Sequence, residues 1–228
     1  MKKNKLSIVF LVIVFSFTCY SYTYGLPKWF PFNNDNALNE WQEKIFKNRV
    51  LYIVKTEEKG GYLSAKSEQA CSSLLYRIKF HPKKFPMISW QWKVSKFPEK
   101  GTNKVAKGGW LEKDDYAARV YVIFPSWIFF KIKCIEYIWD ETLPEGTIIT
   151  SPYSRNIKLI VAESGIKNKN KWVKEERNIY QDYLKAFGRR PGWVGAIALM
   201  TDTDNTLSTA EAQYTNIKVR YKNEQTKE

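Results

Sequence analysis

The feature that most constrains the fold of this chain is a succession of short segments in which apolar and polar residues alternate. Residues 72–80 and 87–94 show the pattern most clearly. Because successive side chains of a β-strand point to opposite faces, such alternation predicts strands with one buried face. Turn residues separate the segments, so we expect a mainly β protein, an antiparallel β-sandwich of the jelly-roll type. The other strand-like segments are residues 50–55, 62–67, 113–124, 127–139, 147–150, 157–162, 194–201 and 210–221.

A single stretch, residues 172–187, has a helical pattern instead. Its apolar residues recur at spacings of three and four, and Gly188 ends the pattern. We therefore expect one amphipathic helix over this stretch. Glu176, Arg177 and Asp182 would lie on that helix, where structural roles are favoured and Arg177 would tie the helix to the sheet.

The chain divides into four parts by composition. Residues 1–25 have the pattern of an export segment, and residues 26–48 form a lead-in with one or two helical turns expected around Trp41. Residues 49–221 are predicted to form a single β-sandwich domain. A polar tail, residues 222–228, follows.

The N-terminus resembles a secretory signal peptide. Lysines at positions 2, 3 and 5 precede an apolar run at residues 6–18, and small residues near Gly25 offer a cleavage site. We expect export to the periplasm or the extracellular space, with the peptide removed. The alternative is an uncleaved anchor extended through Tyr24, which would be the chain's only membrane contact.

The net charge of the full chain is +14, and +11 remains after residues 1–25 are removed with their three lysines. For an exported chain this excess predicts contact with anionic glycan or membrane phosphate and not with nucleic acid. The alternative is a surface of mixed sign with a surplus of lysine, since no basic run is long.

Two cysteines, Cys71 and Cys134, lie outside the export segment. In an oxidising compartment they could form a disulfide, or they could remain as two buried thiols. With a single histidine in the chain, no Cys/His metal site is expected.

The segment 113–124 brings charged residues to the start of a strand. On a strand, Asp115, Arg119 and Tyr121 would share one face, and Tyr116 would point to the opposite, core face. An arginine within an apolar run needs a partner when buried, and Asp115 is the natural candidate. With Asp114, these side chains form a predicted site for a polar ligand. The alternative is a structural ion pair.

A second candidate is the run Thr-Asp-Thr-Asp-Asn-Thr at residues 201–206. Asp202 and Asp204 could offer oxygen ligands to a hard cation such as calcium. The run lacks the glycine and distal glutamate of the known calcium loop, and the same residues are typical of turns. We therefore expect no cofactor, with calcium, turn chemistry and ligand contact through Asn205 as open alternatives.

Aromatic side chains could stack on sugar rings. Trp110, in a glycine-containing loop, is predicted as an exposed platform, and Glu136, Tyr137 and Trp139 are predicted to line the same surface. Tyr153 is a further candidate stacking ring. Trp90 and Trp92 share a strand face with apolar neighbours, so we expect them in the core.

Several strings together resemble an uncharacterised bacterial family, the domain of unknown function numbered three thousand and forty-seven. The resemblance covers roughly residues 41–220 and implies an exported β-sandwich akin to galactose-binding and carbohydrate-binding jelly rolls, with no activity attached. One departure is Leu207, where a glycine would be expected. The strings that carry the resemblance are Ser89-Trp90-Gln91-Trp92-Lys93-Val94, residues 114–122, Ser151-Pro152-Tyr153, Glu176-Arg177-Asn178, Asp182-Tyr183, Phe187-Gly188 and residues 201–206.

These observations favour a non-catalytic envelope protein that binds a carbohydrate or another polar ligand. One alternative is a hydrolase or lyase that uses two carboxylates to act on polysaccharide. Another is a structural or partner-binding component of the envelope.

Overall fold

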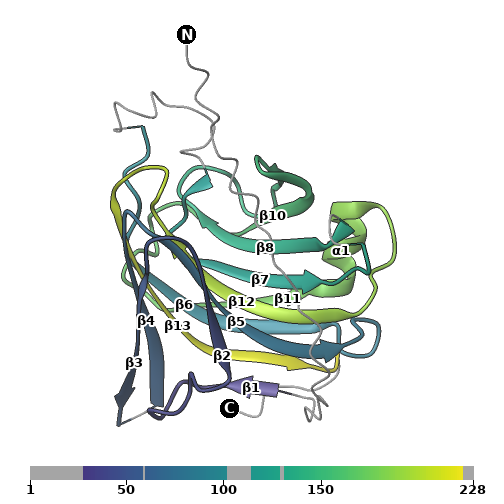
Figure 1. The fold of residues 1–228 in the computed structure, drawn as a ribbon, viewed down its shortest axis with the longest axis horizontal. Helices are drawn as coiled ribbons and strands as arrows, with labels where there is room; N and C mark the ends of the chain where they lie inside the picture. Colours follow the sequence, from purple (N-terminus) through teal and green to yellow (C-terminus); the bar gives the residue numbers. More distant parts are fainter. Residues whose placement is uncertain (1–27, 59, 102–113, 129–130, 223–228) are drawn as a thin grey trace.

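Two packed β-sheets and one helix make up the part of the chain that the structure describes (Figure 1). The computed structural model describes residues 28–58, 60–101, 114–128 and 131–222. In chain order the elements are β1 Lys28–Phe30, β2 Trp41–Lys47, β3 Leu51–Glu57, β4 Gly60–Glu68, β5 Cys71–Phe80, β6 Met87–Lys96, β7 Arg119–Phe124, β8 Lys133–Asp140, β9 Ile148–Ser151, β10 Ser154–Ser164, β11 Val173–Asn178, α1 Ile179–Phe187, β12 Val194–Asp202 and β13 Thr209–Arg220.

The strand order confirms the expected jelly-roll-like β-sandwich. One sheet has six strands, in the order β11-β6-β13-β4-β3 with β1 paired to β13. The other has seven, in the order β2-β5-β12-β7-β8-β10-β9. Neighbouring strands are antiparallel, except that β8 and β10 run parallel. Each sheet therefore combines strands that lie far apart in the sequence.

Aromatic side chains fill the space between the sheets. Trp90 and Trp92 on β6 are completely buried, which confirms their predicted place in the core. The Trp90 ring centroid lies 5.2 Å from that of Tyr137, and the Trp92 centroid lies 5.9 Å from that of Trp139. Because β6 and β8 belong to different sheets, these contacts hold the two layers together.

The outer face of the seven-stranded sheet is also buried. Every residue of β7 is buried, and Tyr121, Ile123 and Met200 belong to a second apolar cluster on this face. A strand buried on both faces has a continuous apolar sequence, as β7 has after its first residue. Arg119, that first residue, is thus placed where a charge needs partners.

The lead-in segment contributes strands to both sheets. β1 pairs with β13, and β2 pairs with β5 along the edge of the seven-stranded sheet. The helical turns expected around Trp41 are therefore wrong. The Trp41 ring packs against Phe30 and Tyr76, with centroids 5.2 and 5.4 Å away, and these tertiary contacts override the weak local pattern.

The single helix is shorter than predicted, because its expected first half forms β11 on the edge of the six-stranded sheet. Glu176 and Arg177 are therefore strand residues. The helix begins after Asn178, whose side chain accepts a hydrogen bond from the Gln181 amide, and it ends at Gly188 with a φ of 66°. Arg177 forms an ion pair with Asp182 and so links strand to helix, as expected.

The two cysteines are unpaired, so the disulfide alternative is wrong. Cys71 lies on β5 and Cys134 on β8, with β12 and β7 between them in the sheet. Strands are spaced by about 4.8 Å, whereas a disulfide requires Cα atoms within about 7 Å.

The predicted export segment and its cleavage site lie outside the described residues. Across the described part of the chain, no helix has both the length and the apolar character needed to cross a membrane.

Gly61 on β4 permits a close approach of the chain. A Cβ atom placed there would lie 2.1 Å from the Phe32 carbonyl oxygen. We predict that Gly61→Ala lowers the free energy of unfolding by about 1–3 kcal/mol, because backbone must move to admit the methyl group. Urea denaturation would measure the loss. Gly192→Ala is the matched control, since its Cβ would meet open space. Equal stability of the two variants would contradict the prediction.

Candidate functional site

The segment before β7 is not strand but a docked loop. β7 begins at Arg119, and the residues before it lie along the end of β12. The Tyr116 amide donates to Asp202 Oδ1 at 3.1 Å, and Thr201 Oγ1 donates to the Ala117 carbonyl at 2.7 Å. The predicted strand alternation therefore fails before Arg119.

Arg119 is the centre of the candidate site. Its Nε and Nη2 donate to the two oxygens of Asp202 at 3.0 and 2.7 Å, which makes a bidentate pair. Its Nη1 donates to Glu136 at 3.1 Å and to the Tyr121 hydroxyl at 3.4 Å. Strands β7, β8 and β12 thus supply one buried cluster, and four predicted site residues meet in it.

Asp115 does not pair with Arg119, contrary to prediction. Its carboxylate accepts from the Thr206 amide at 2.6 Å, the Thr206 hydroxyl at 2.7 Å and the Asn205 amide at 3.1 Å. The Asn205 side chain donates to it as well, at 3.0 Å. Asp115 therefore holds the loop after β12, and its role is structural. Turn chemistry thus accounts for this part of residues 201–206.

Asp114 completes the cluster. One of its oxygens lies 3.7 Å from Arg119 Nη2. The other, Oδ1, is buried and has no hydrogen-bond partner among the described residues. Three carboxylates, those of Asp114, Glu136 and Asp202, therefore share one guanidinium. A buried polar oxygen without a partner is unusual, because its desolvation is uncompensated.

Burial changes the protonation of these acids. Loss of solvent raises the pKa of Asp114 to about 6 and that of Glu136 to about 7, against the opposing pull of Arg119. Burial also raises the pKa of Asp202. Glu136 can therefore act as a hydrogen-bond acceptor or as a donor near neutral pH. Shifts of this kind are concentrated at functional sites, although structural networks produce them too.

Tyr116 covers the guanidinium on the outer face of the seven-stranded sheet, so the prediction that it faces the core between the sheets is wrong. Its ring centroid lies 4.7 Å from Arg119 Cζ, and the Lys100 ammonium lies 4.2 Å from the same centroid. Both cations therefore interact with this one ring.

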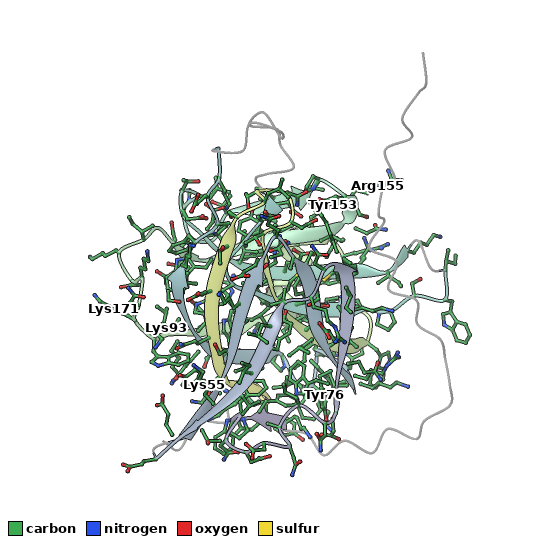
Figure 2. The ribbon with its side chains drawn as sticks, turned by 60° about the vertical axis from the view of Figure 1, so that its left-hand side comes forward. Lys55, Tyr76, Lys93, Tyr153, Arg155 and Lys171 are labelled. Atoms are coloured by element: carbon green, nitrogen blue, oxygen red, sulfur yellow. The ribbon has the colours of Figure 1, made fainter. Side chains whose placement is uncertain are left out.

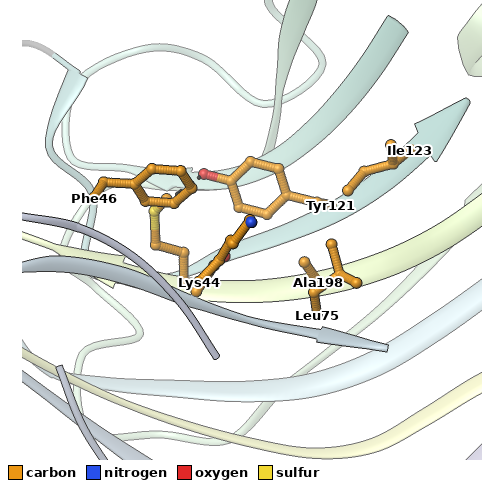
Figure 3. Close-up of a pocket in the computed structure, with 8 residues that line it drawn as sticks. Lys44, Phe46, Leu75, Tyr121, Ile123 and Ala198 are labelled. Carbon is orange, nitrogen blue, oxygen red and sulfur yellow. Dashed lines mark hydrogen bonds between the residues drawn. The ribbon is translucent and has the colours of Figure 1, made fainter. Parts of the chain in front are cut away.

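A hollow lies beside the cluster on the outer face of the seven-stranded sheet (Figure 3). It is a shallow depression: the space along it, open solvent included, is about 300 Å³, but its cavity volume is only about 20 Å³. Lys44, Phe46 and Tyr121 form one part of its wall. The Tyr121 hydroxyl, which accepts from Arg119 and donates to the Met200 sulfur, connects the hollow to the charged cluster.

The sequence did not indicate Phe46 and Lys44 as site residues. They lie on β2, in the stretch for which helical turns were expected, and only the pairing of β2 with β5 brings them to this face. Their alternation on a short edge strand is the one pattern that could have identified them.

The other predicted site residues lie around the loop after β12. The Tyr153 hydroxyl donates to the Asn205 side chain at 3.2 Å. Asp204 lies 4.0 Å from the Lys47 ammonium. Leu207 adopts a φ of 52°, so its position has the backbone conformation for which a glycine was expected. Trp110 lies outside the described residues.

The residues nearest to a cation site fit calcium poorly. Oxygens of Asp202 and Asp204 and the sulfur of Cys71 approach within 4.8 Å of one another. Both Asp202 oxygens are already bound by Arg119, and burial raises the pKa of the Cys71 thiol well above its ordinary value. Calcium prefers six to eight oxygen ligands, and this set offers too few.

Comparison with known proteins identifies a family and several distant folds. A family model described as a protein of unknown function (DUF3047) matches residues 39–218. No curated protein matches the sequence.

Three solved structures illustrate the fold likeness. A family 30 carbohydrate-binding module of a cellulosomal cellulase from Clostridium thermocellum is 8% identical, with a TM-score of 0.42 over 81% of this chain and 93% of that one. The xyloglucanase domain of NopAA from Sinorhizobium fredii, in complex with cellobiose, is 10% identical, with a TM-score of 0.44 over 80% and 93%. The glycoside hydrolase domain of Endo-D from Streptococcus pneumoniae is 8% identical, with a TM-score of 0.40 over 81% of this chain but 22% of that one. Likenesses this weak assign no ligand to the chain.

The raised pKa values predict how stability depends on pH. Unfolding returns Glu136 and Asp114 to ordinary values near 4.5 and 3.8. Between about pH 4 and pH 7 the folded protein therefore binds more protons than the unfolded chain, and the free energy of unfolding falls as pH rises. We expect a loss on the order of 2 kcal/mol between about pH 5 and pH 7, measured by urea denaturation.

Glu136→Gln should flatten this dependence, whereas Asp35→Asn, a change at an exposed acid, should leave it intact. A wild-type protein that becomes more stable as pH rises through this window would contradict the assignment.

Proposed function

Since the chain belongs to the family described as a protein of unknown function (DUF3047), which carries no assigned activity, we propose from the geometry that it binds a carbohydrate or a similarly hydroxyl-rich ligand. The site is the outer face of the seven-stranded sheet at Arg119. The observation that carries the proposal is the surplus of buried carboxylate there, with Asp114 Oδ1 lacking a partner among the described residues.

The ligand class follows from what such a surplus needs. Asp114 and Glu136 share Arg119 with Asp202, so their oxygens retain capacity to accept hydrogen bonds. Hydroxyl groups donate such bonds without adding negative charge, whereas a phosphate or carboxylate would add to the excess. A nucleic acid is therefore a poor fit for this site, and a sugar is a good one.

The adjoining hollow supplies the apolar half of such a site. Phe46 and Tyr121 present rings there, and Lys44 offers a donor at the rim. A sugar ring has apolar faces and polar edges, so it pairs with rings on one side and carboxylates on the other. We infer that the ligand lies over the shallow hollow and approaches the buried cluster from the side of the Tyr121 hydroxyl, which contacts Arg119.

Export is part of the proposal. The basic and apolar pattern of residues 1–25 supports a signal peptide, with an uncleaved anchor as the alternative and the only expected membrane contact. A carbohydrate ligand fits such a destination in the periplasm or outside the cell.

Binding of neutral oligosaccharides tests the proposal. Using cello-, xylo- and chito-oligosaccharides in a glycan array followed by calorimetry, we expect wild-type binding and at least a tenfold loss in Glu136→Gln, because a charged hydrogen bond is removed. Asp35→Asn should bind as the wild type does. Unchanged affinity in Glu136→Gln, with near-ultraviolet circular dichroism showing an intact fold, would rule out this site.

A second candidate function is glycoside hydrolysis. The specific observation is that Asp114 and Glu136 both contact Arg119 and that burial raises their pKa values to about 6 and about 7, so near neutral pH one carboxyl can hold a proton while the other is ionised. The same oligosaccharides should emerge intact if the protein only binds. Release of new reducing ends that is abolished in Glu136→Gln would establish the hydrolase and overturn the non-catalytic reading.

A further inference from the structure

A groove lies on the opposite side of the molecule, on the outer face of the six-stranded sheet. Its empty space is about 700 Å³, part of it open to solvent. Trp29 on β1 and Trp172, the residue before β11, line it together with side chains of β4, β6 and β13. Figure 2 shows the separation of the two regions. Lys93 and Lys171, which neighbour Trp172 of the groove, lie at one side of the molecule. Tyr153, which contacts Asn205 in the loop after β12, lies at the top. The groove is thus separate from the Arg119 site.

Two indole rings are exposed in the groove. Trp29 is 55% exposed and Trp172 is 40% exposed, although the other face of this sheet buries its tryptophans completely. A single exposed ring is ordinary, but two large rings that line one groove form an apolar patch of the kind that marks a binding surface. An indole offers a flat apolar face, which suits the C–H face of a sugar ring.

Contacts within the chain hold both indoles in place. Trp29 Nε1 donates to Asn216 Oδ1 at 3.1 Å, and the Lys218 ammonium lies 4.7 Å from the ring centroid. Trp172 packs against Tyr62 with centroids 5.9 Å apart, and the Lys93 ammonium lies 5.2 Å from its ring. Rings fixed before binding lose less entropy when a ligand arrives.

The floor of the groove is polar and largely uncharged. Gln91 on β6 and Asn216 on β13 are joined by a hydrogen bond of 3.5 Å. A carboxamide both donates and accepts, so it can pair with hydroxyl groups in either sense. Lys218 and Lys93 lie against the two indole rings, and Glu57 of β3 also lines the groove. The amides of the floor therefore suit the hydroxyl groups of a neutral sugar, whereas Glu57 would repel an anionic ligand.

The backbone is irregular at the same place. Asn216 has a φ of 51°, in the left-handed region that asparagine adopts readily, and the register between β13 and β6 shifts between Thr215 and Lys218. A bulge of this kind re-aims a side chain. Here the bulge turns the Asn216 amide toward Trp29 and the groove.

We propose that this groove is a second binding site, which takes a neutral oligosaccharide stacked on Trp29 and Trp172 over a floor formed by Gln91 and Asn216. This proposal goes beyond the function proposed above, because the groove lies on the other sheet and includes no residue of the Arg119 cluster. A chain with both sites could hold two segments of polysaccharide, one on each face of the sandwich.

The test uses the full mature chain with cellohexaose, xylohexaose and chitohexaose as probes. We expect Trp29→Ala and Trp172→Ala, each made in the Glu136→Gln background so that the Arg119 site does not contribute, to weaken binding of the preferred hexasaccharide at least tenfold, because a stacking face is lost. Trp193→Ala in the same background is the matched control, since Trp193 is 53% exposed but lies outside the groove. It should bind as Glu136→Gln alone does.

Two further measurements separate this site from the one at Arg119. Glu136→Gln should leave the groove intact, so stacking should still be seen as a blue shift of tryptophan fluorescence that disappears in the Trp172→Ala variant. Conservative Trp29→Phe, which keeps an aromatic ring, should retain part of the affinity. If Trp29→Ala and Trp172→Ala bind all three probes as tightly as Trp193→Ala, the groove proposal is overturned. Loss of all binding in Glu136→Gln alone would overturn it too, while supporting the other site.

Discussion

The buried ion pair between Arg119 and Asp202 is the interaction on which the candidate site depends. It joins the start of β7 to the end of β12, and Glu136 adds β8 to the same guanidinium. A buried guanidinium without partners would be strongly destabilising. The three strands must therefore keep the register that brings Asp202 and Glu136 to Arg119. The loop before β7 and the loop after β12 then dock around the pair, through Tyr116 and Asp115.

The two sheets present opposite kinds of polar surface. The seven-stranded sheet buries both faces of β7 and holds Asp114 and Glu136 beside its outer apolar cluster, where burial raises their pKa values to about 6 and about 7. The six-stranded sheet buries one face and leaves amides and indoles on the other. One surface therefore carries acids that titrate near neutral pH, and the other carries amides and exposed rings.

Much of the architecture follows from local pattern. Alternation in residues 72–80 and 87–94 predicted strands and put Trp90 and Trp92 in the core, and Gly188 marked the end of the helix. The pattern failed at β11 and β2, both edge strands. An edge strand is held by pairing on one side with few buried residues, so its sequence carries a weak periodic signal that helical spacing can imitate.

What the sequence by itself determined was the class of fold, the faces of its strongest strands and the presence of a charged residue that must find partners. Only the tertiary structure decided which partners those are. Asp115, two residues from Arg119, holds a loop instead, while Asp202 and Glu136 come from neighbouring strands. The same holds for Trp29 and Trp172, which reach one groove from distant parts of the chain. The physical reason is that the order of strands in the sheets determines which distant residues come into contact. That order depends on the packing of the whole core.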